Sequence, residues 1–302
     1  MGLTRLIKSN LIWIKLLFIN GRILFVLEAN FLNTVNNESD PLPFVAPCAQ
    51  LTLSAPWQWL KLGFKDVFRA PLASVSYGVV MSGLIVAVTA MAWQFGSAWI
   101  MFSLLCGFVF IAPIACVGTY AISAQLERGM SVSIKRTLQA CFKRYIGTEL
   151  VFALVLLVIF LLWARASSMA SIFLPNSAEH NFDNMVTYLS VLALVALLFL
   201  SITFAASVFS LPMIMHRDVD AITAVVTSVN AVMRNKRVML FWGWLIATGL
   251  LLGMATFGLA LVLFLPAVGH AVWHGYLETI DVSEFPRHKT GITATARPSS
   301  AH

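Results

Sequence analysis

The residues best suited to chemistry in this sequence are two histidines near its C-terminal end. His270 and His274 lie in the segment Gly269-His270-Ala-Val-Trp273-His274-Gly-Tyr276, so on a helix they would share one face. Imidazole nitrogens ligate copper, zinc and haem iron, which makes the pair a candidate metal or haem site. The alternative is structural, because His, Trp and Tyr also anchor helix ends at the headgroup level of a membrane. No carboxylate precedes the pair in an HExxH pattern, and we expect anchoring rather than ligation.

Other catalytic motifs are weak or absent. His216-Arg217-Asp218 resembles a kinase catalytic loop, but no glycine-rich loop, β3 lysine or DFG motif accompanies it. Asp218 and Asp220 could together hold a divalent cation. The simpler prediction is that Asp220 caps the following helix by accepting its free N–H groups. The sequence also lacks a Ser–His–Asp grouping, a P-loop and a GxGxxG motif, so we expect no enzymatic activity.

The composition excludes a soluble globular protein. Hydrophobic residues make up 59% of the chain and charged residues 11%, whereas soluble domains carry about 25% charged residues. A helical bundle in lipid needs few charges, because each helix satisfies its own backbone polar groups. The net charge of +7 favours cytoplasmic loops against anionic lipid. It does not favour nucleic acid, since no basic groove with interleaved aromatic residues is visible. The four cysteines lack the spacing of a zinc or iron–sulfur motif.

The longest uncharged stretch indicates how the chain crosses the membrane. No Asp, Glu, Lys or Arg occurs from Val238 to Leu277. As one helix this stretch would be about 60 Å long, about twice the thickness of the hydrocarbon core. Two spans account for it, folded back at the weakly helical segment from Gly253 to Gly258. The stretch therefore predicts a transmembrane helical hairpin.

The same order of elements recurs three times along the chain. An amphipathic segment comes first, then a span, then a returning span that ends near a Phe and a Pro. The amphipathic segments are Trp57–Ala70, with Leu60, Phe64, Val67 and Phe68 on the apolar face and Asp66 elsewhere, Ile134 to Phe142, and Val225 to Met233, with Val225, Val229, Val232 and Met233 on the apolar face. The spans before the hairpin are Leu72–Trp93, Ala98–Ala121, Thr148–Ser168 and Asn184–Pro212. We predict an all-α, polytopic transmembrane bundle of about six spans, built as three repeats of an amphipathic surface helix plus a helical hairpin.

The distribution of basic residues predicts the orientation. If both termini and the surface helices lie on one side, every Lys and Arg except Arg165 lies there too. The positive-inside rule then places both termini in the cytoplasm, in a bacterial cytoplasmic membrane. A chain of five spans would instead export the basic tail, so the rule favours six.

Three regions follow from this scheme. Residues 1–50 form an N-terminal extension and linker, in which Leu11–Leu27 is either an interfacial helix or a segment without a role. Residues 51–283 form the transmembrane domain, and residues 284–302 form a disordered tail.

Small residues predict where the helices touch. Ser74, Gly78 and Ser82 recur at four-residue spacing, and Gly249 with Gly253 forms a GxxxG motif. Close approach of backbones is a main attraction between helices in lipid, so both patterns indicate packing seams. We expect contacts within the chain, with homodimerisation as the alternative.

A series of short motifs runs through residues 41–281. They are Trp59-Leu-Lys-Leu-Gly63 with Asp66, Arg69 and Pro71; Pro113 with Gly118 and Tyr120; Ser210-Leu-Pro212; Arg217-Asp218-Val-Asp220-Ala-Ile-Thr-Ala224 with Thr227-Ser228-Val229; and Pro266 to Tyr276. Together they resemble an uncharacterised family of bacterial membrane proteins, domain of unknown function 2189. The resemblance implies a multi-span integral membrane protein without an established activity.

Some members of that family are labelled as associated with cytochrome c oxidase. A catalytic oxidase subunit needs histidine ligands for its haem and copper centres on several spans. This chain has six histidines in all, and His180, His288 and His302 lie in a predicted loop or in the tail. The label is therefore compatible only with an accessory or assembly role.

Three functions stay open. The nearly charge-free spans favour a non-enzymatic structural or accessory component that needs no cofactor. A transporter or channel for a neutral or amphiphilic small molecule is the second, because Pro113, Pro212 and Pro266 lie at matching depth in three returning helices. The third is a haem- or copper-binding accessory that uses His270 and His274. The expected partners are the lipid bilayer and other membrane proteins.

Overall fold

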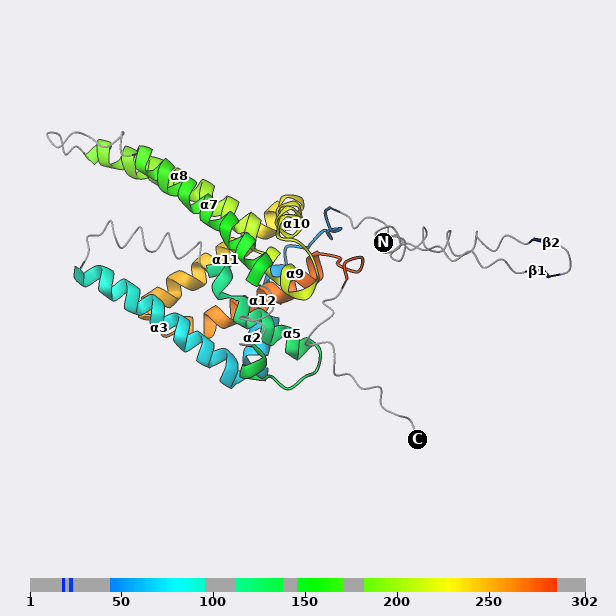
Figure 1. Ribbon diagram of the computed structural model, residues 1–302. Coiled ribbons are helices and arrows are strands. Elements are labelled where there is room, and N and C mark those ends of the chain that lie inside the picture. Colours follow the sequence, from blue (N-terminus) through cyan, green and yellow to red (C-terminus); the bar gives the residue numbers. More distant parts are fainter. Residues whose placement is uncertain are drawn as a thin grey trace, which may run out of the picture. The chain divides into compact units, whose positions relative to one another are not determined.

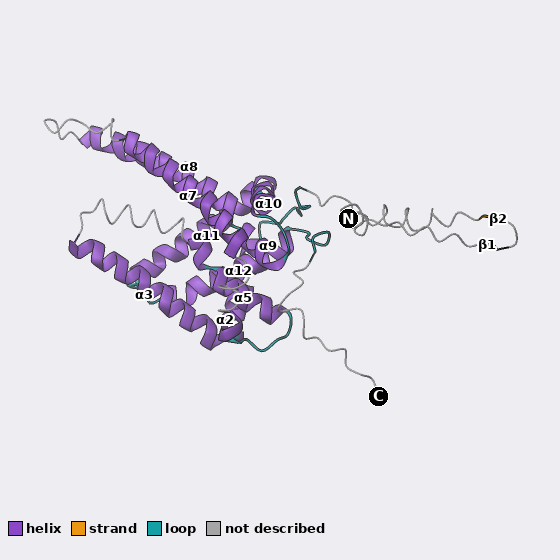
Figure 2. Cartoon of the chain, viewed as in Figure 1, coloured by secondary structure: helices purple, strands orange, loops and turns teal. Residues whose placement is uncertain are grey.

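The computed structural model describes residues 18–19, 22–23, 44–95, 112–137, 146–170 and 182–286. Helices dominate these residues (Figure 2). The strands that the described part contains are β1 (Phe18–Ile19) and β2 (Arg22–Ile23), an antiparallel pair within the N-terminal unit Met1–Pro43. The predicted helical class is confirmed.

The second unit, Phe44–His302, contains all the described helices. In chain order (Figure 1) they are α2 (Ala55–Arg69), α3 (Pro71–Phe95), α5 (Val117–Glu127), α7 (Ile146–Ala170), α8 (Phe182–Ser207), α9 (Ser210–His216), α10 (Ala221–Arg234), α11 (Lys236–Ala255) and α12 (Leu261–Thr279). Four helical stretches of the described part are long and apolar enough to cross a membrane: Pro71–Met91, Leu150–Met169, Val186–His216 and Lys236–Ala255. Most of the predicted span Ala98–Ala121 lies outside the described residues. The count of about six spans and the threefold repeat therefore stay predictions.

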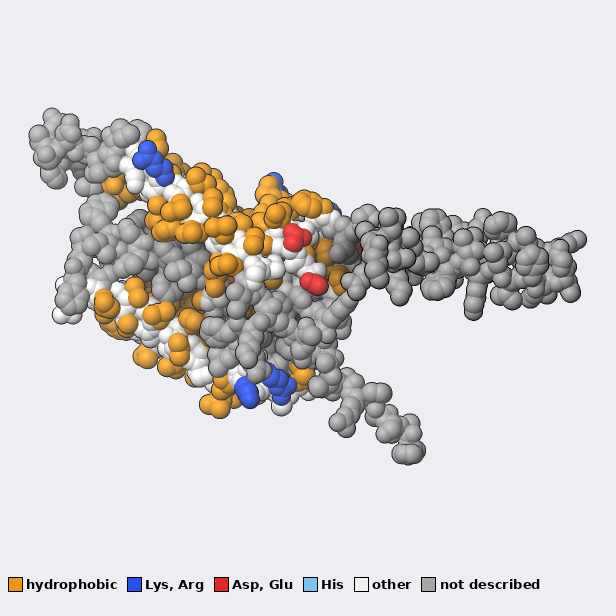
Figure 3. Space-filling view, in the orientation of Figure 1, with side chains coloured by type: hydrophobic (Ala, Val, Ile, Leu, Met, Phe, Trp, Pro, Cys, Tyr) orange, Lys and Arg blue, Asp and Glu red, His pale blue; other side chains and the backbone are white. Residues whose placement is uncertain are grey.

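The outer faces of these long helices are apolar. Figure 3 shows hydrophobic side chains along α3, α7 and α8. Exposed large side chains include Val80 and Leu84 of α3, Leu154 and Leu161 of α7, Leu194 and Leu197 of α8, and Leu240 and Leu251 of α11. Soluble proteins rarely expose apolar patches beyond about a few hundred Å². These faces suit contact with lipid chains, as an integral membrane protein requires.

The uncharged stretch forms a helical hairpin, of which α11 is a candidate membrane span and α12 is not, so the second predicted span stays a prediction. α11 ends at Ala255 and α12 begins at Leu261. Between them Phe257 has a φ of 53° and Gly258 a φ of 87°, a left-handed conformation that glycine adopts without steric cost. The hydroxyl of Ser82 on α3 donates to the carbonyl oxygen of Gly258 at 2.7 Å. The turn is therefore held against α3.

α12 lies at the centre of the described bundle and packs against α2, α3, α5 and α11. Glycines permit its closest contacts. A Cβ on Gly63 of α2 would lie 2.2 Å from the carbonyl oxygen of Ala267, and a Cβ on Gly78 of α3 would lie 1.9 Å from that of Val262. Real side chains never approach so closely, so only glycine allows these backbones to touch.

Both predicted seams are confirmed as contacts within the chain. Ser74, Gly78 and Ser82 face α12 or the turn before it. Gly249 and Gly253 of α11 face two side chains of α12, Phe264 and Leu261 respectively. The small-residue patterns thus mark intramolecular packing, which leaves homodimerisation through them without support.

The amphipathic segment Trp57–Ala70 is a helix, α2, but part of its predicted apolar face is wrong. Leu60 and Val67 are buried as expected, whereas Phe68 is 70% exposed. The face that meets α12 carries Trp59 and Asp66 instead, which are 1% and 3% exposed. The close backbone approach at Gly63 selects this face over the bulkier one.

The third amphipathic segment forms α10, and it too turns an unexpected face inward. Its buried residues are small, among them Ala224, Ser228 and Ala231. The hydroxyl of Ser228 donates to the carbonyl oxygen of Ala205 at 2.7 Å and accepts from the backbone N–H of Phe209. These short contacts hold α10 against α8 and α9. Val225 and Val232 are partly buried against the core, whereas Ile222 and Met233 are exposed. The second amphipathic segment lies partly beyond the described residues.

The described residues just outside the expected boundaries at residues 50 and 283 pack with the helical unit. The backbone N–H of Ala49 donates to Thr279 at 2.8 Å, and that of Asp281 donates to Pro47 at 2.9 Å. Phe285 is 2% exposed. Residues 44–50 and 284–286 thus pack with the helices, because extended segments pair across the end of α12. The remainder of the expected tail, residues 287–302, lies outside the described residues.

The N-terminal extension differs from an interfacial helix where it is described. Phe18 pairs with Ile23, and Ile19 with Arg22, in an antiparallel register. The rest of residues 1–43 lies outside the described part, so the role of the extension stays a prediction.

Asp220 is the N-cap of α10, as predicted, and it should make stability depend on pH. Its carboxylate accepts from the backbone N–H of Thr223 at 2.9 Å. Burial alone would raise the pKa of Asp220, but the hydrogen bonds from Thr223 and its neighbours hold that pKa below its ordinary value. The stabilisation is therefore present above about pH 4, the unfolded value, and is lost as pH falls through the lower folded pKa.

We expect Asp220→Ala to lower the free energy of unfolding by about 1 kcal/mol at neutral pH. Asp220→Ser is the matched control, because it keeps a capping oxygen but carries no titratable charge. It should retain most of the stability and lose the dependence on pH below about pH 4. Unfolding in mixed micelles over a pH series measures both. Equal pH profiles for Asp220→Ser and the unmodified protein would contradict this role.

Candidate functional site

A polar cluster surrounds the C-terminal half of α12, from His270 to Glu278. His270 is fully buried, and both of its ring nitrogens are hydrogen-bonded. Nε2 lies 3.0 Å from the hydroxyl of Ser74 on α3, and Nδ1 lies 2.6 Å from the hydroxyl of Ser123 on α5. One imidazole therefore joins three helices.

His274 lies one turn further along α12 and contacts a different helix. Its Nε2 donates to the Asp66 carboxylate of α2 at 2.7 Å. Arg69 lies 3.6 Å from the other carboxylate oxygen. The exposed fractions of the side chains are 4% for Asp66, 24% for His274 and 55% for Arg69. The pair thus lies at the edge of the buried interior, with the guanidinium towards the outside.

Three aromatic side chains complete the cluster. The indole N–H of Trp273 donates to Glu127 of α5 at 3.1 Å, and that of Trp59 donates to Glu278 at 2.5 Å. The hydroxyl of Tyr276 lies 3.0 Å from Nδ1 of His216, at the end of α9. Each contact connects α12 to another helix.

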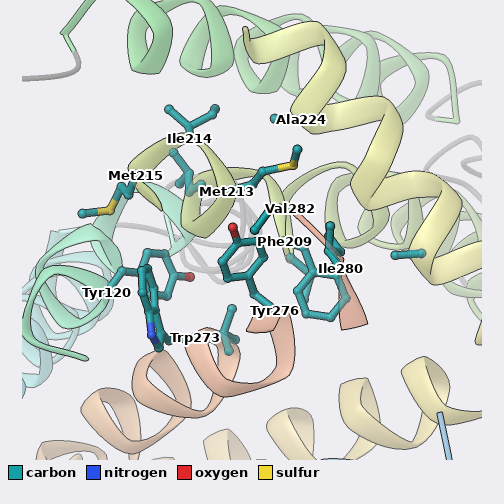
Figure 4. Packing of buried hydrophobic residues seen from close by; sticks show 14 of the residues in the cluster. Tyr120, Phe209, Met213, Ile214, Met215, Ala224, Trp273, Tyr276, Ile280 and Val282 are labelled. Carbon is teal, nitrogen blue, oxygen red and sulfur yellow. The ribbon is translucent and has the colours of Figure 1, made fainter. Parts of the chain in front are cut away.

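This arrangement contradicts the interpretation of Trp273 and Tyr276 as membrane-interface anchors. They are 1% and 0% exposed. Figure 4 shows both side chains extending from α12 into the hydrophobic core, which contains Tyr120, Phe209 and Met213. The anchoring prediction is wrong because α2, α5 and α9 cover this end of α12, so its aromatic rings meet protein rather than lipid headgroups.

Comparison with known protein families identifies part of this chain. Residues 100–216 match the family model of predicted integral membrane proteins, DUF2189. The match includes α5, α7, α8 and α9, and with them Ser123, Glu127 and His216 of the polar cluster. It confirms the resemblance over that part of the chain. Comparison with curated proteins and with solved structures gives no match.

The DUF2189 match does not test the metal hypothesis for His270 and His274, but the geometry of the two imidazoles disfavours it. The two imidazoles share one face of α12, as predicted, yet they point to different helices. A metal or haem iron would have to displace a serine hydroxyl from His270. Among the described residues, no group of three or more His, Cys, Asp or Glu side chains could hold a metal ion. The donor set here therefore fits hydrogen bonding better than ligation.

Sequence reasoning missed the three carboxylates of this site: Asp66, Glu127 and Glu278. For Asp66 a signal existed. Trp59, Gly63 and Asp66 lie at spacings of four and three residues, which place them on one helical face. A tryptophan and a glycine on that face would have indicated burial. No comparable pattern surrounds Glu127 or Glu278, because each is selected by an indole N–H from a distant segment.

Proposed function

We propose that this chain is a non-enzymatic structural or accessory component of a bacterial cytoplasmic membrane, with both termini in the cytoplasm. One observation carries the proposal: each of the two histidines best suited to chemistry is hydrogen-bonded to side chains of other helices. His270 joins α12 to α3 and α5, and His274 joins it to α2. The charge distribution described above supports the orientation.

The energetics of such contacts favour a structural role. An unpaired polar group in an apolar interior costs about 2 kcal/mol or more, whereas a paired network holds its members in a single arrangement. A general acid or base must instead be free to exchange a proton with a substrate. Here the hydroxyls of Ser74 and Ser123 occupy both nitrogens of His270. The network is thus suited to fixing helices rather than to turnover.

An accessory role is tested in native membranes. We expect the protein, extracted in mild detergent at its natural abundance, to migrate with a partner protein at the same ratio in two different detergents. Purified protein should show no haem spectrum, and its metal content should be unchanged by His270→Ala or His274→Ala. Migration of the chain alone in both detergents, or a haem signal that His270→Ala removes, would overturn the proposal.

A transporter for a neutral or amphiphilic small molecule is the second candidate, and the Asp66–His274 pair favours it. A carboxylate in contact with histidine inside a membrane protein is typical of proton-coupled pathways. Pro266 lies within α12 about two turns before His274, and it removes one helical hydrogen bond. This candidate predicts solute uptake into proteoliposomes under a pH gradient, abolished by Asp66→Asn. Uptake equal to that of protein-free liposomes would exclude it.

A further inference from the structure

Three basic residues lie together at the corner between α10 and α11. Arg234 ends α10, and Lys236 and Arg237 begin α11, with only Asn235 between the two helices. All three basic side chains are exposed. Among the described residues, no ion pair joins a carboxylate to any of these three cations.

The position of two of these cations is electrostatically unfavourable within the chain. Lys236 and Arg237 lie in the first turn of α11, which contains no acidic residue. The helix N-terminus carries a partial positive charge, so each cation there is destabilised. An anion at the corner would reverse this, because the side chains and the helix end would all attract it.

The corner is held in place by Asn235, which is 6% exposed. Its side-chain N–H groups donate to the carbonyl oxygens of Ala49 at 2.9 Å and Ala231 at 3.1 Å. Its side-chain oxygen accepts from the backbone N–H of Leu51 at 2.9 Å. The backbone that carries the three cations is therefore fixed on both sides, which lowers the entropy cost of binding an anion.

Apolar side chains continue from the cations along the same helix. Leu240 is 78% exposed and Trp244 is 59% exposed. They follow Lys236 at four-residue spacing, so the three share one face of α11. Trp244 stacks on Phe241 at 5.8 Å with an interplanar angle of 17°. One face thus presents cations at its end and an apolar, aromatic surface beside them.

We propose that Arg234, Lys236 and Arg237 bind the headgroup of an anionic phospholipid whose acyl chain lies along Leu240 and Trp244. Charge complementarity selects the headgroup, and the exposed apolar face selects a lipid over a soluble anion. Tryptophan commonly lies at the headgroup level, and Trp244 follows the cations by about two helical turns. The proposal goes beyond the accessory role and does not depend on it, since it needs only that the chain is embedded in a bilayer.

The experiment titrates purified full-length protein in neutral detergent with phosphatidylglycerol, and native mass spectrometry measures the retained lipid. The test variant is Arg234→Gln/Lys236→Gln/Arg237→Gln. The control Lys61→Gln/Lys65→Gln/Lys135→Gln removes the same charge from exposed positions elsewhere. A cation near the membrane surface contributes about 1 kcal/mol, so we expect about a hundredfold weaker binding in the test variant and a small change in the control. Arg234→Lys/Arg237→Lys keeps the charge and should keep binding within about tenfold.

Three results would overturn the proposal. Equal losses in the test and control variants would indicate general attraction to charge. Binding of phosphatidylcholine as strong as that of phosphatidylglycerol would show that the anionic headgroup does not determine binding. Competition by glycerophosphate at concentrations similar to those of the lipid would indicate a soluble-anion site without an acyl chain. If the test variant does not fold, Lys236→Gln alone takes its place, with an expected loss of about fivefold against Lys61→Gln.

Discussion

Gly78→Ala is expected to destabilise the protein far more than Gly83→Ala, although both glycines lie in α3. A Cβ at residue 78 would lie 1.9 Å from the carbonyl oxygen and 2.8 Å from the carbonyl carbon of Val262. Backbone atoms of α12 cannot rotate away as a side chain would, so the two helices must separate. We expect a loss of about 3 kcal/mol or more in the free energy of unfolding.

Gly83 is the matched control, because a Cβ there meets nothing within 4 Å. Gly83→Ala should leave stability unchanged or raise it by up to about 1 kcal/mol, through the higher helix propensity of alanine. Unfolding by SDS in mixed micelles, followed by tryptophan fluorescence, compares the two variants. Similar effects at both positions would show that α3 does not contact α12 along this face.

His274→Ala is expected to cost about 3 kcal/mol of unfolding free energy, because it leaves the Asp66 carboxylate buried without its closest partner. Asp66 lies 2.7 Å from His274 Nε2, and its side chain is 4% exposed. Asp66→Asn should cost less, about 1 kcal/mol, since an amide oxygen can still accept the hydrogen bond and no charge is left buried. The same SDS titration measures both variants.

The double variant of Asp66 and His274 measures the interaction between these two side chains apart from their other contacts. Asp66→Asn with His274→Ala should lower the free energy of unfolding by clearly less than the sum of the two single variants. In the double variant no charged carboxylate is left buried without its partner. Arg69→Gln is the control for an exposed partner of the same carboxylate. It should cost less than about 1 kcal/mol, as exposed ion pairs usually do. Strict additivity in the double variant would mean that the two side chains do not interact in the membrane-embedded protein.

The features predicted correctly from the sequence are those that depend on neighbouring residues. The hairpin turn near Gly258 follows from a local weakness in helix formation within an uncharged stretch. The cap at Asp220 depends on Thr223, three residues away. The small-residue stripe of Ser74, Gly78 and Ser82 has a regular spacing. Each of these patterns involves residues that are close together in the chain, and the structure agrees with the expected interpretation.

The polar cluster could not be predicted from the sequence because its hydrogen-bonded partners are far apart in the chain. Asp66 and His274 are separated by 208 positions, and Ser123 and His270 by 147. Asp66 was assigned to the polar side of a surface helix because a charged residue is usually solvated. A buried carboxylate is stable only beside a suitable donor, and the sequence does not show which helices meet. The same reason explains why Trp273 and Tyr276 were expected at the membrane interface.

Labelling from the lipid phase tests most directly the claim that the C-terminal half of α12 is enclosed by protein while α3, α7, α8 and α11 face lipid. Purified protein in liposomes that contain a photoactivatable lipid analogue is irradiated, and the labelled residues are mapped by mass spectrometry. We expect strong labelling of Leu150–Met169 and of Leu240 and Leu251, and almost none from His270 to Tyr276. Labelling of the segment from His270 to Tyr276 as strong as that of Leu150–Met169 would contradict the account.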